Sequence, residues 1–172
     1  GPVNKVAYVF ATTGLVNAAT ASDAPAMIMA AVMAAGMVPP LAIALATVVR
    51  PKLWTKQERE SGKSCWLLGA SFISEGAIPF AASDPLRMIP SFMLGGAVAG
   101  GLVMAFGVGQ LAPHGGIWVL PLIGHPLLFV VALVAGFVVS ALAIIGVKEY
   151  SARKAAAADA AATAGEAVVV AG

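Results

Sequence analysis

Residues 126–147 read PLLFVVALVAGFVVSALAIIGV, an apolar run without a single charged side chain. A helix needs about 20 apolar residues to cross the hydrocarbon core of a bilayer, so this run predicts a membrane-spanning helix. Residues 25–49 and 88–111 form two further runs of this kind, and residues 3–21 form another apolar piece. Pro39-Pro40 lies inside the run 25–49 and predicts a kinked or broken helix there.

The composition of the whole chain agrees with a membrane protein. Hydrophobic residues make up 60% of the 172 residues and charged residues only 10%, far from the balance of water-soluble domains. A net charge of +2 gives no reason to expect nucleic acid as a partner. Because Cys65 is the single cysteine, a disulfide within the chain and a cysteine metal cluster are excluded. We expect neither a metal nor a cofactor.

Basic residues gather in two short clusters that predict the topology. The segment 50–63 (RPKLWTKQERESGK) holds half of all Lys and Arg in the chain, and a second cluster lies at 148–154. By the positive-inside rule, the segment 50–63 should be a cytoplasmic loop, and the second cluster should be cytoplasmic too. The chain must then cross the membrane an even number of times between them.

Four apolar pieces lie between the two clusters, so two of them must fall short of a full crossing. The pieces 64–82 and 113–124 are interrupted by glycine and proline, and we interpret both as re-entrant segments. Irregular backbone persists at membrane depth only where it lines a cavity or is buried in protein. We therefore predict an all-α integral membrane protein of about four transmembrane helices plus two re-entrant hairpin segments, which are candidate walls of a binding site.

The two ends of the chain carry separate expectations. The opening residues 1–5 (GPVNK) lack an initiator Met and a signal-peptide pattern, so we interpret the chain as truncated before them. Residues 1–147 are expected to form the membrane domain. Residues 148–172 are expected to form a flexible, Ala-rich cytoplasmic tail.

A carboxylate in the middle of an apolar segment is the strongest candidate for a functional group. Glu75 lies between Ser74 and Gly76 in the piece 64–82. Burying a carboxylate at the bilayer centre costs on the order of 2.5–3.5 kcal/mol, so such a group normally faces a cavity, a partner or a substrate. Its oxygens can accept hydrogen bonds from neighbouring sugar hydroxyls. The alternative is a structural charge satisfied by nearby backbone N–H groups.

Other polar residues in or beside the broken segments are weaker candidates. Asp84 and Arg87 stand three residues apart and are expected to form a local ion pair rather than contact a ligand. His114 lies in the piece 113–124, where a site role and a structural role are equally supported. His125 is expected to be structural, and Asn4 is either a helix cap or a site residue.

Three motifs in the chain resemble those of a known family. Residues 73–82 (ISEGAIPFAA), followed by 84–87 (DPLR), resemble the signature of the fructose-type IIC permeases of the bacterial phosphoenolpyruvate-dependent sugar phosphotransferase system. The upstream GPVNK at 1–5 and the downstream PHGG at 113–116 resemble two more motifs of that family, in the same order. The family usually has Thr where this chain has Ser74, which keeps the hydroxyl.

The resemblance implies a multi-pass permease of the bacterial inner membrane with a cytoplasmic C-terminus. It would translocate a sugar, fructose by the family's example, while a phosphocysteine on a soluble IIB domain phosphorylates it. Glu75 would bind the sugar and take part in catalysis, and Ser74, Gly76, Asn4 and His114 would supply further sugar contacts. The implied partners are the IIB domain, the IIC helices that precede this segment, membrane lipid and a second copy of the chain.

Two alternatives to an active permease segment stay open at this point. An intramembrane hydrolase would use Ser74 as nucleophile and His114 as base, but no Gly-x-Ser-Gly turn is present. An inactive structural fragment would need a partner chain to restore activity, so the segment by itself is not expected to be an enzyme. Small-residue pairs at 95–109, such as Gly96/Gly100, fit either a dimer contact or tight packing within one protomer.

Overall fold

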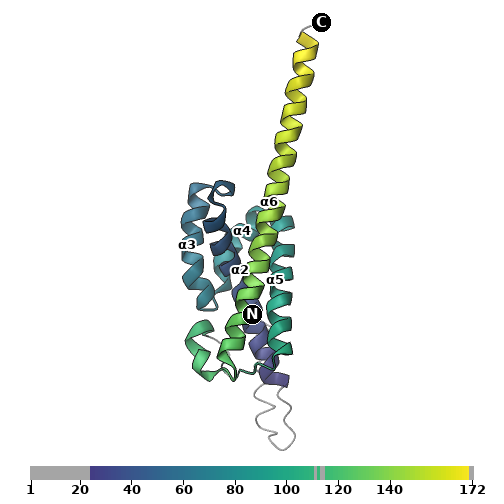
Figure 1. The fold of residues 1–172 in the computed structure, drawn as a ribbon. Coiled ribbons are helices and arrows are strands. Elements are labelled where there is room, and N and C mark those ends of the chain that lie inside the picture. The colour runs from purple at the N-terminus through teal and green to yellow at the C-terminus, as the bar shows by residue number, and fades with distance from the viewer. Residues whose placement is uncertain (1–23, 111, 113–114, 171–172) are drawn as a thin grey trace, which may run out of the picture.

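The structure, a computed structural model, describes residues 24–110, 112 and 115–170, with side chains described from residue 26 to residue 158. Within these ranges the chain is helical and has no strand; Gln110 and Ile123 form an isolated antiparallel bridge. Figure 1 shows a bundle of upright helices. The predicted all-α architecture is confirmed.

Three long helices form the bundle and match the three longest predicted spans. They are α2 (Ala24–Val49), α5 (Pro85–Ala105) and α6 (Pro126–Val170), and each is long and apolar enough to cross a membrane. α2 packs against both α5 and α6, and these two also pack against each other. α6 continues well beyond the other helices, as Figure 1 shows in yellow. The fourth predicted span, 3–21, lies outside the described residues.

The boundaries of two spans differ from the predictions. α2 runs unbroken through Pro39 and Pro40, so the predicted break is absent. α5 begins at Pro85 rather than at 88, because proline suits the first turn of a helix, where its missing N–H is not needed. It ends at Ala105 rather than near 111, and Gly107 follows in the left-handed conformation (φ +64°) that commonly ends helices.

Charged side chains of the described residues gather at one end of the bundle, its charged end. At the charged end α2 leads into a short helix, η1 (Pro51–Leu53), and Arg50 forms an ion pair with Glu149 of α6 at 3.1 Å. At the opposite end the backbone N–H of Gln110 donates to the carbonyl of Ala26 at 3.0 Å. Both predicted basic clusters therefore lie at the same end, as the even number of crossings requires.

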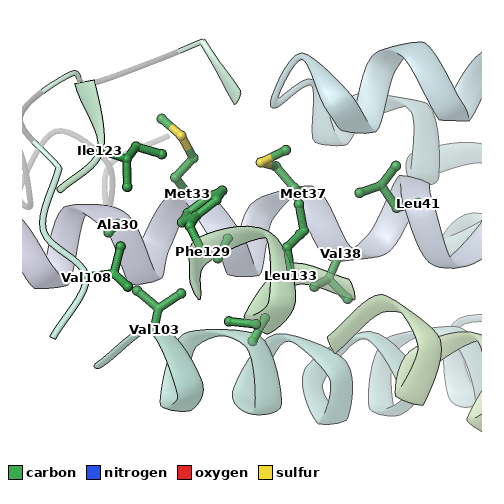
Figure 2. Close-up of a cluster of buried hydrophobic side chains, with 13 residues drawn as sticks. Ala30, Met33, Met37, Val38, Leu41, Val103, Val108, Ile123, Phe129 and Leu133 are labelled. Carbon is green, nitrogen blue, oxygen red and sulfur yellow. The ribbon is translucent and has the colours of Figure 1, made fainter. Parts of the chain in front are cut away.

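The main hydrophobic core lies between α2, α5, α6 and the segment that joins the last two. Figure 2 shows Met33 and Met37 of α2 facing Phe129 and Leu133 of α6. The core side chains are Ala30, Met33, Ala34, Met37, Val38, Leu41, Ala99, Val103, Val108, Ile123, Phe129, Ala132 and Leu133. A second cluster, which includes Trp54, Cys65, Phe80 and Met88, fills the charged half of the bundle.

The small residues of α5 are used for packing within the protomer. A methyl group on Gly95 would lie 2.5 Å from the carbonyl oxygen of Gly136 on α6. On the α2 side, a methyl group on Gly96 would lie 3.7 Å from Ala35, and one on Gly100 would lie 3.7 Å from the carbonyl oxygen of Ala31. Helices approach this closely only where side chains are small. Gly95, Gly96 and Gly100 thus hold α5 against its own neighbours.

The C-terminal tail is helical as far as it is described. α6 continues without interruption from its apolar part to Val170. The side chains of Arg153 and Lys154 are exposed on this extension. The sequence-based division at residue 148 and the flexibility of the tail stay predictions.

Candidate functional site

The carboxylate predicted to bind sugar lies in a helical hairpin beside α2. The hairpin consists of α3 (Lys56–Ala70), η2 (Ser74–Ala77) and α4 (Ile78–Ser83). Thr55 at its start and Ser83 at its end line one cavity of about 140 Å³. The chain therefore enters and leaves the hairpin at the same end of the bundle. This is the geometry expected of a re-entrant segment, although it starts earlier than the predicted residue 64.

The hairpin begins in the segment that we expected to be a cytoplasmic loop. Thr55 accepts a hydrogen bond from the backbone N–H of Glu58 at 3.2 Å, and the Glu58 carboxylate accepts one from the backbone N–H of Thr55 at 2.7 Å. This reciprocal capping box starts α3 among charged residues. Since α3 begins at Lys56, the segment 50–63 is partly helical rather than a loop. The first half of α3 is polar and only its second half is apolar.

Glycines allow α3 to lie directly on α2. A methyl group on Gly62 would lie 2.5 Å from the Thr47 hydroxyl oxygen. Two helical turns later, a methyl group on Gly69 would lie 2.7 Å from Leu41. Because both glycines face α2, the hairpin is attached along the whole length of its first helix.

The tip of the hairpin is fixed by Phe72. This residue has a left-handed backbone conformation (φ +63°), which is unfavourable for a bulky side chain and is found where surrounding contacts enforce it. Its ring packs onto Gly36 in the middle of α2, where a methyl group would lie 2.5 Å from the ring atom Cε2. Gly36 therefore provides the space that receives the tip.

Glu75 follows this tip as the second residue of η2. Its side chain is exposed, and within the described part of the chain it forms no hydrogen bond and no ion pair. The alternative of a structural carboxylate held by nearby backbone N–H groups therefore finds no support among the described residues. Ser74 beside it is exposed as well. Among the described residues no group occupies the carboxylate oxygens, which can accept hydrogen bonds from a ligand.

Gly76 has a packing role in the hairpin. A methyl group there would lie 2.8 Å from Leu68 of α3, so η2 can lie against α3 only with glycine at this position. The Cys65 thiol donates to the Gly76 carbonyl at 3.4 Å and further ties the two limbs together. Gly76 thus holds Glu75 in place, whereas its predicted contact with sugar stays a prediction.

The downstream motif meets the tip of the hairpin. Gly116, the first residue of η3 (Gly116–Leu122), has φ +58° and lies so close to the carbonyl of Ala70 that a methyl group there would overlap it. Trp118 donates its indole N–H to the hydroxyl of Ser71 at 3.1 Å. Residues 70–71, directly before the motif at 73–82, therefore lie against residues 116–118, which begin with the last residue of the motif at 113–116. In Figure 1 the green η3 lies below α3.

Gln110 fixes the chain just before the downstream motif. Its buried side chain donates through Nε2 to the carbonyl of Ala112 at 2.6 Å, while its Oε1 has no partner among the residues that the structure describes. The predicted site residues His114 and Asn4 lie outside the described residues. Of the predicted site residues, the structure therefore describes Ser74, Glu75 and Gly76.

The remaining candidates, the pair Asp84 and Arg87 and the residue His125, lie at helix ends. Arg87 donates to the Asp84 carboxylate at 2.8 Å, which confirms the predicted local ion pair. His125 lies directly before α6, exposed, with its backbone carbonyl accepting from the N–H of Phe129. No group of three His, Cys, Asp or Glu side chains among the described residues is arranged to hold a metal.

Fold and site together define an all-α membrane protein with a carboxylate on a hairpin that lies beside its spanning helices. Comparison with known proteins is more specific. The chain is 48% identical over 148 residues to "PTS system fructose-specific EIIC component" of Haloferax volcanii, covering 86% of the chain and 38% of that protein. It is 48% identical over 147 residues to "Fructose permease IIC component" of Bacillus amyloliquefaciens, covering 86% and 46%.

A third relative carries a compound name. The chain is 50% identical over 146 residues to "PTS system fructose-specific EIIB'BC component" of Escherichia coli, covering 83% of the chain and 25% of that protein. The chain thus spans less than half the length of these relatives. No protein-family profile and no solved structure matches it. The resemblance to the fructose-type IIC permeases is confirmed: the chain is homologous to a fructose-type IIC domain over about 85% of its length.

Proposed function

We propose that this chain is the site-bearing part of a fructose permease of the phosphotransferase system. The permease moves the sugar across the bacterial inner membrane while a IIB phosphocysteine phosphorylates it. The observation that carries the proposal is Glu75, exposed at a fixed hairpin tip and without a partner among the described residues. The relatives are named fructose-specific IIC components, and their names supply the substrate. No observation favours an intramembrane hydrolase.

The proposed orientation follows from the charged end of the bundle. Arg50, Lys52, Arg87 and Lys148 gather there, and the positive-inside rule places such an end in the cytoplasm. The C-terminus of α6 is then cytoplasmic too. The hairpin enters from the cytoplasm, its polar half stays near that surface, and its tip carries Glu75 toward the middle of the bundle.

In the proposed mechanism, Glu75 positions the sugar and receives a proton. Its carboxylate accepts hydrogen bonds from sugar hydroxyls, with Ser74, Asn4 and His114 adding contacts. When the hydroxyl attacks the phosphocysteine, an O–P bond forms, the S–P bond breaks, the thiolate leaves and the hydroxyl proton passes to Glu75. Phosphoryl transfer depends mainly on positioning and electrostatics, so one well-held carboxylate has a large effect.

The proposed partners follow from the same picture. The relative from E. coli has EIIB'BC in its name, which supports a IIB domain as phosphoryl donor. Because the chain covers less than half of the length of these relatives, we include preceding IIC helices as partners in the assembled permease. Membrane lipid and a second copy of the chain complete the proposed assembly, and the segment by itself is not proposed to transport.

The experiment compares Glu75→Gln with Glu60→Gln in the assembled permease. Glu60 lies on the same hairpin but is exposed near the charged end, paired with Lys63 at 2.9 Å, and serves as the matched control. We expect Glu75→Gln to abolish binding of labelled fructose and its phosphorylation by phosphorylated IIB, whereas Glu60→Gln retains both. Wild-type behaviour of a correctly inserted Glu75→Gln would show that the site does not depend on this carboxylate.

A further inference from the structure

Three basic side chains from three separate elements converge on one pocket at the charged end. Lys52 comes from η1, Arg87 from the first turn of α5 and Lys148 from α6. The pocket has a volume of about 430 Å³ and lies at the charged end, whereas Glu75 follows the tip of the hairpin. Its other lining residues are Leu53, Asp84, Ser151, Ala152 and Ala155.

Among the described residues, the lining of the pocket holds more positive than negative charge. Arg87 is paired with Asp84, the one carboxylate in the lining. Lys52 and Lys148 form no ion pair within the described part of the chain. The Lys148 ammonium lies 3.7 Å from the centroid of the Trp54 ring, and this cation–π contact holds it in position. An anion entering the pocket would therefore meet two unpaired ammonium groups.

These cations lie where the apolar spans end. Lys148 is the first charged residue after the apolar run 126–147, and Arg87 is the third residue of α5. Lys52 follows the end of α2 by three residues. Since all three spans leave the hydrocarbon core at this level, the pocket lies at the depth of the lipid headgroups rather than in bulk water.

The surface next to the pocket is apolar. Leu86, adjacent to Arg87, is 87% exposed, and Met93, seven residues further on the same side of α5, is 69% exposed. A ligand that fits both surfaces has an anionic head and a hydrocarbon tail. This combination favours a lipid over a soluble phosphoprotein, which would have no use for the apolar stripe.

We propose that this pocket binds the phosphate headgroup of an acidic phospholipid, with its acyl chains lying along the exposed face of α5. Lys52 and Lys148 supply the unpaired charges, and Ser151 offers a hydroxyl donor. The site is independent of the sugar site, so its test does not depend on fructose binding.

The test is a lipid titration of the assembled permease in neutral detergent, followed by native mass spectrometry. The probes are phosphatidylglycerol, zwitterionic phosphatidylcholine and inorganic phosphate. The variant is Lys52→Gln with Lys148→Gln, and the matched control is Arg153→Gln with Lys154→Gln, which removes the same charge from exposed positions of α6 outside the pocket. We expect the wild-type permease to bind phosphatidylglycerol more tightly than phosphatidylcholine. Removal of each pocket lysine should weaken the binding of phosphatidylglycerol about fivefold.

Each outcome decides the proposal. A loss in the pocket variant with less than a twofold loss in the control supports it. Equal losses in the two variants would show unspecific attraction and overturn the proposal. Equal binding of the two lipids by the wild-type permease would also overturn it, and this comparison needs no variant. If inorganic phosphate displaces the lipid completely at equal concentration, the pocket recognises a free anion. If phosphorylated IIB alone occupies the pocket, the ligand is a protein. Either result overturns the lipid assignment.

Discussion

Substitution of Gly36 by Ala tests whether the contact with Phe72 holds the hairpin in place. The added methyl group would lie 2.5 Å from Cε2 and 3.3 Å from Cδ2 of the Phe72 ring. Since ordinary carbon contacts lie at about 3.5–4.0 Å, the ring must move by about 1 Å. It has little freedom to do so, because its backbone is held in a left-handed turn against Gly116.

The expected magnitude is a difference between two opposing effects. Overpacking of a core contact destabilises by about 1–3 kcal/mol. Replacing a helix-interior glycine by alanine by itself stabilises by about 1 kcal/mol. Gly101 of α5 provides the reference for the second effect, since no atom lies within 4 Å of a methyl group placed there. We therefore expect Gly36→Ala to be less stable than Gly101→Ala by about 1–3 kcal/mol.

The assay has two readouts on the same purified proteins. Thermal unfolding in detergent measures stability. Titration with labelled fructose measures sugar affinity, which by the proposed function depends on the position of Glu75, three residues after Phe72. We expect Gly36→Ala to weaken fructose binding and Gly101→Ala to leave it unchanged. In the Gly36→Ala background, Phe72→Leu should restore part of the stability, because the smaller side chain leaves room for the methyl group.

Two results would refute this reasoning. Equal stability of Gly36→Ala and Gly101→Ala would mean that the ring moves aside without cost. Additive effects of Gly36→Ala and Phe72→Leu would mean that the two residues do not act through their contact.

Further predictions concern the helix contacts and the second wall of the site. Gly95→Ala should lower stability by about 1–3 kcal/mol in thermal unfolding, because its methyl group meets the Gly136 carbonyl, which is backbone; unchanged stability would show that α5 and α6 separate freely. Gly116→Ala should cost at least about 1–2 kcal/mol and weaken fructose binding, since φ is positive and the Ala70 carbonyl blocks the methyl group; wild-type binding would contradict this. Trp118→Phe removes one hydrogen bond and should cost about 1 kcal/mol of stability, whereas no loss would mean that water replaces it.

The three long helices could be predicted because an uncharged run of more than 20 residues has few alternatives in a folded chain. The exact starts of two helices, α5 and α3, were partly readable as well. Pro85 after Asp84 indicates the first turn of α5, and Thr55 with Glu58 three residues later is a capping-box pattern. We gave more weight to the charges around them and therefore interpreted 50–63 as a loop.

The site was predictable only in its chemistry. A carboxylate in an apolar segment identifies Glu75, whereas the contacts that hold it depend on tertiary structure. Nothing in the sequence indicates that Phe72 adopts a left-handed conformation usually reserved for glycine, or that Gly36 lies opposite it. Pairing of Trp118 with Ser71 likewise joins residues far apart in the chain. Local sequence patterns carry no information about such pairs.

The hairpin has a consequence for biogenesis. Because α3 and α4 meet the bundle at one end, the charged residues 56–63 need never be translocated through the bilayer when that end faces the cytoplasm. Only the apolar second half of α3 and the short return have to move inward. The hairpin can therefore dock after α5 and α6 have left the insertion machinery, using α2 as its template. Assembly of the proposed sugar site would then be a late step of membrane-protein maturation, separate from the insertion of the spanning helices.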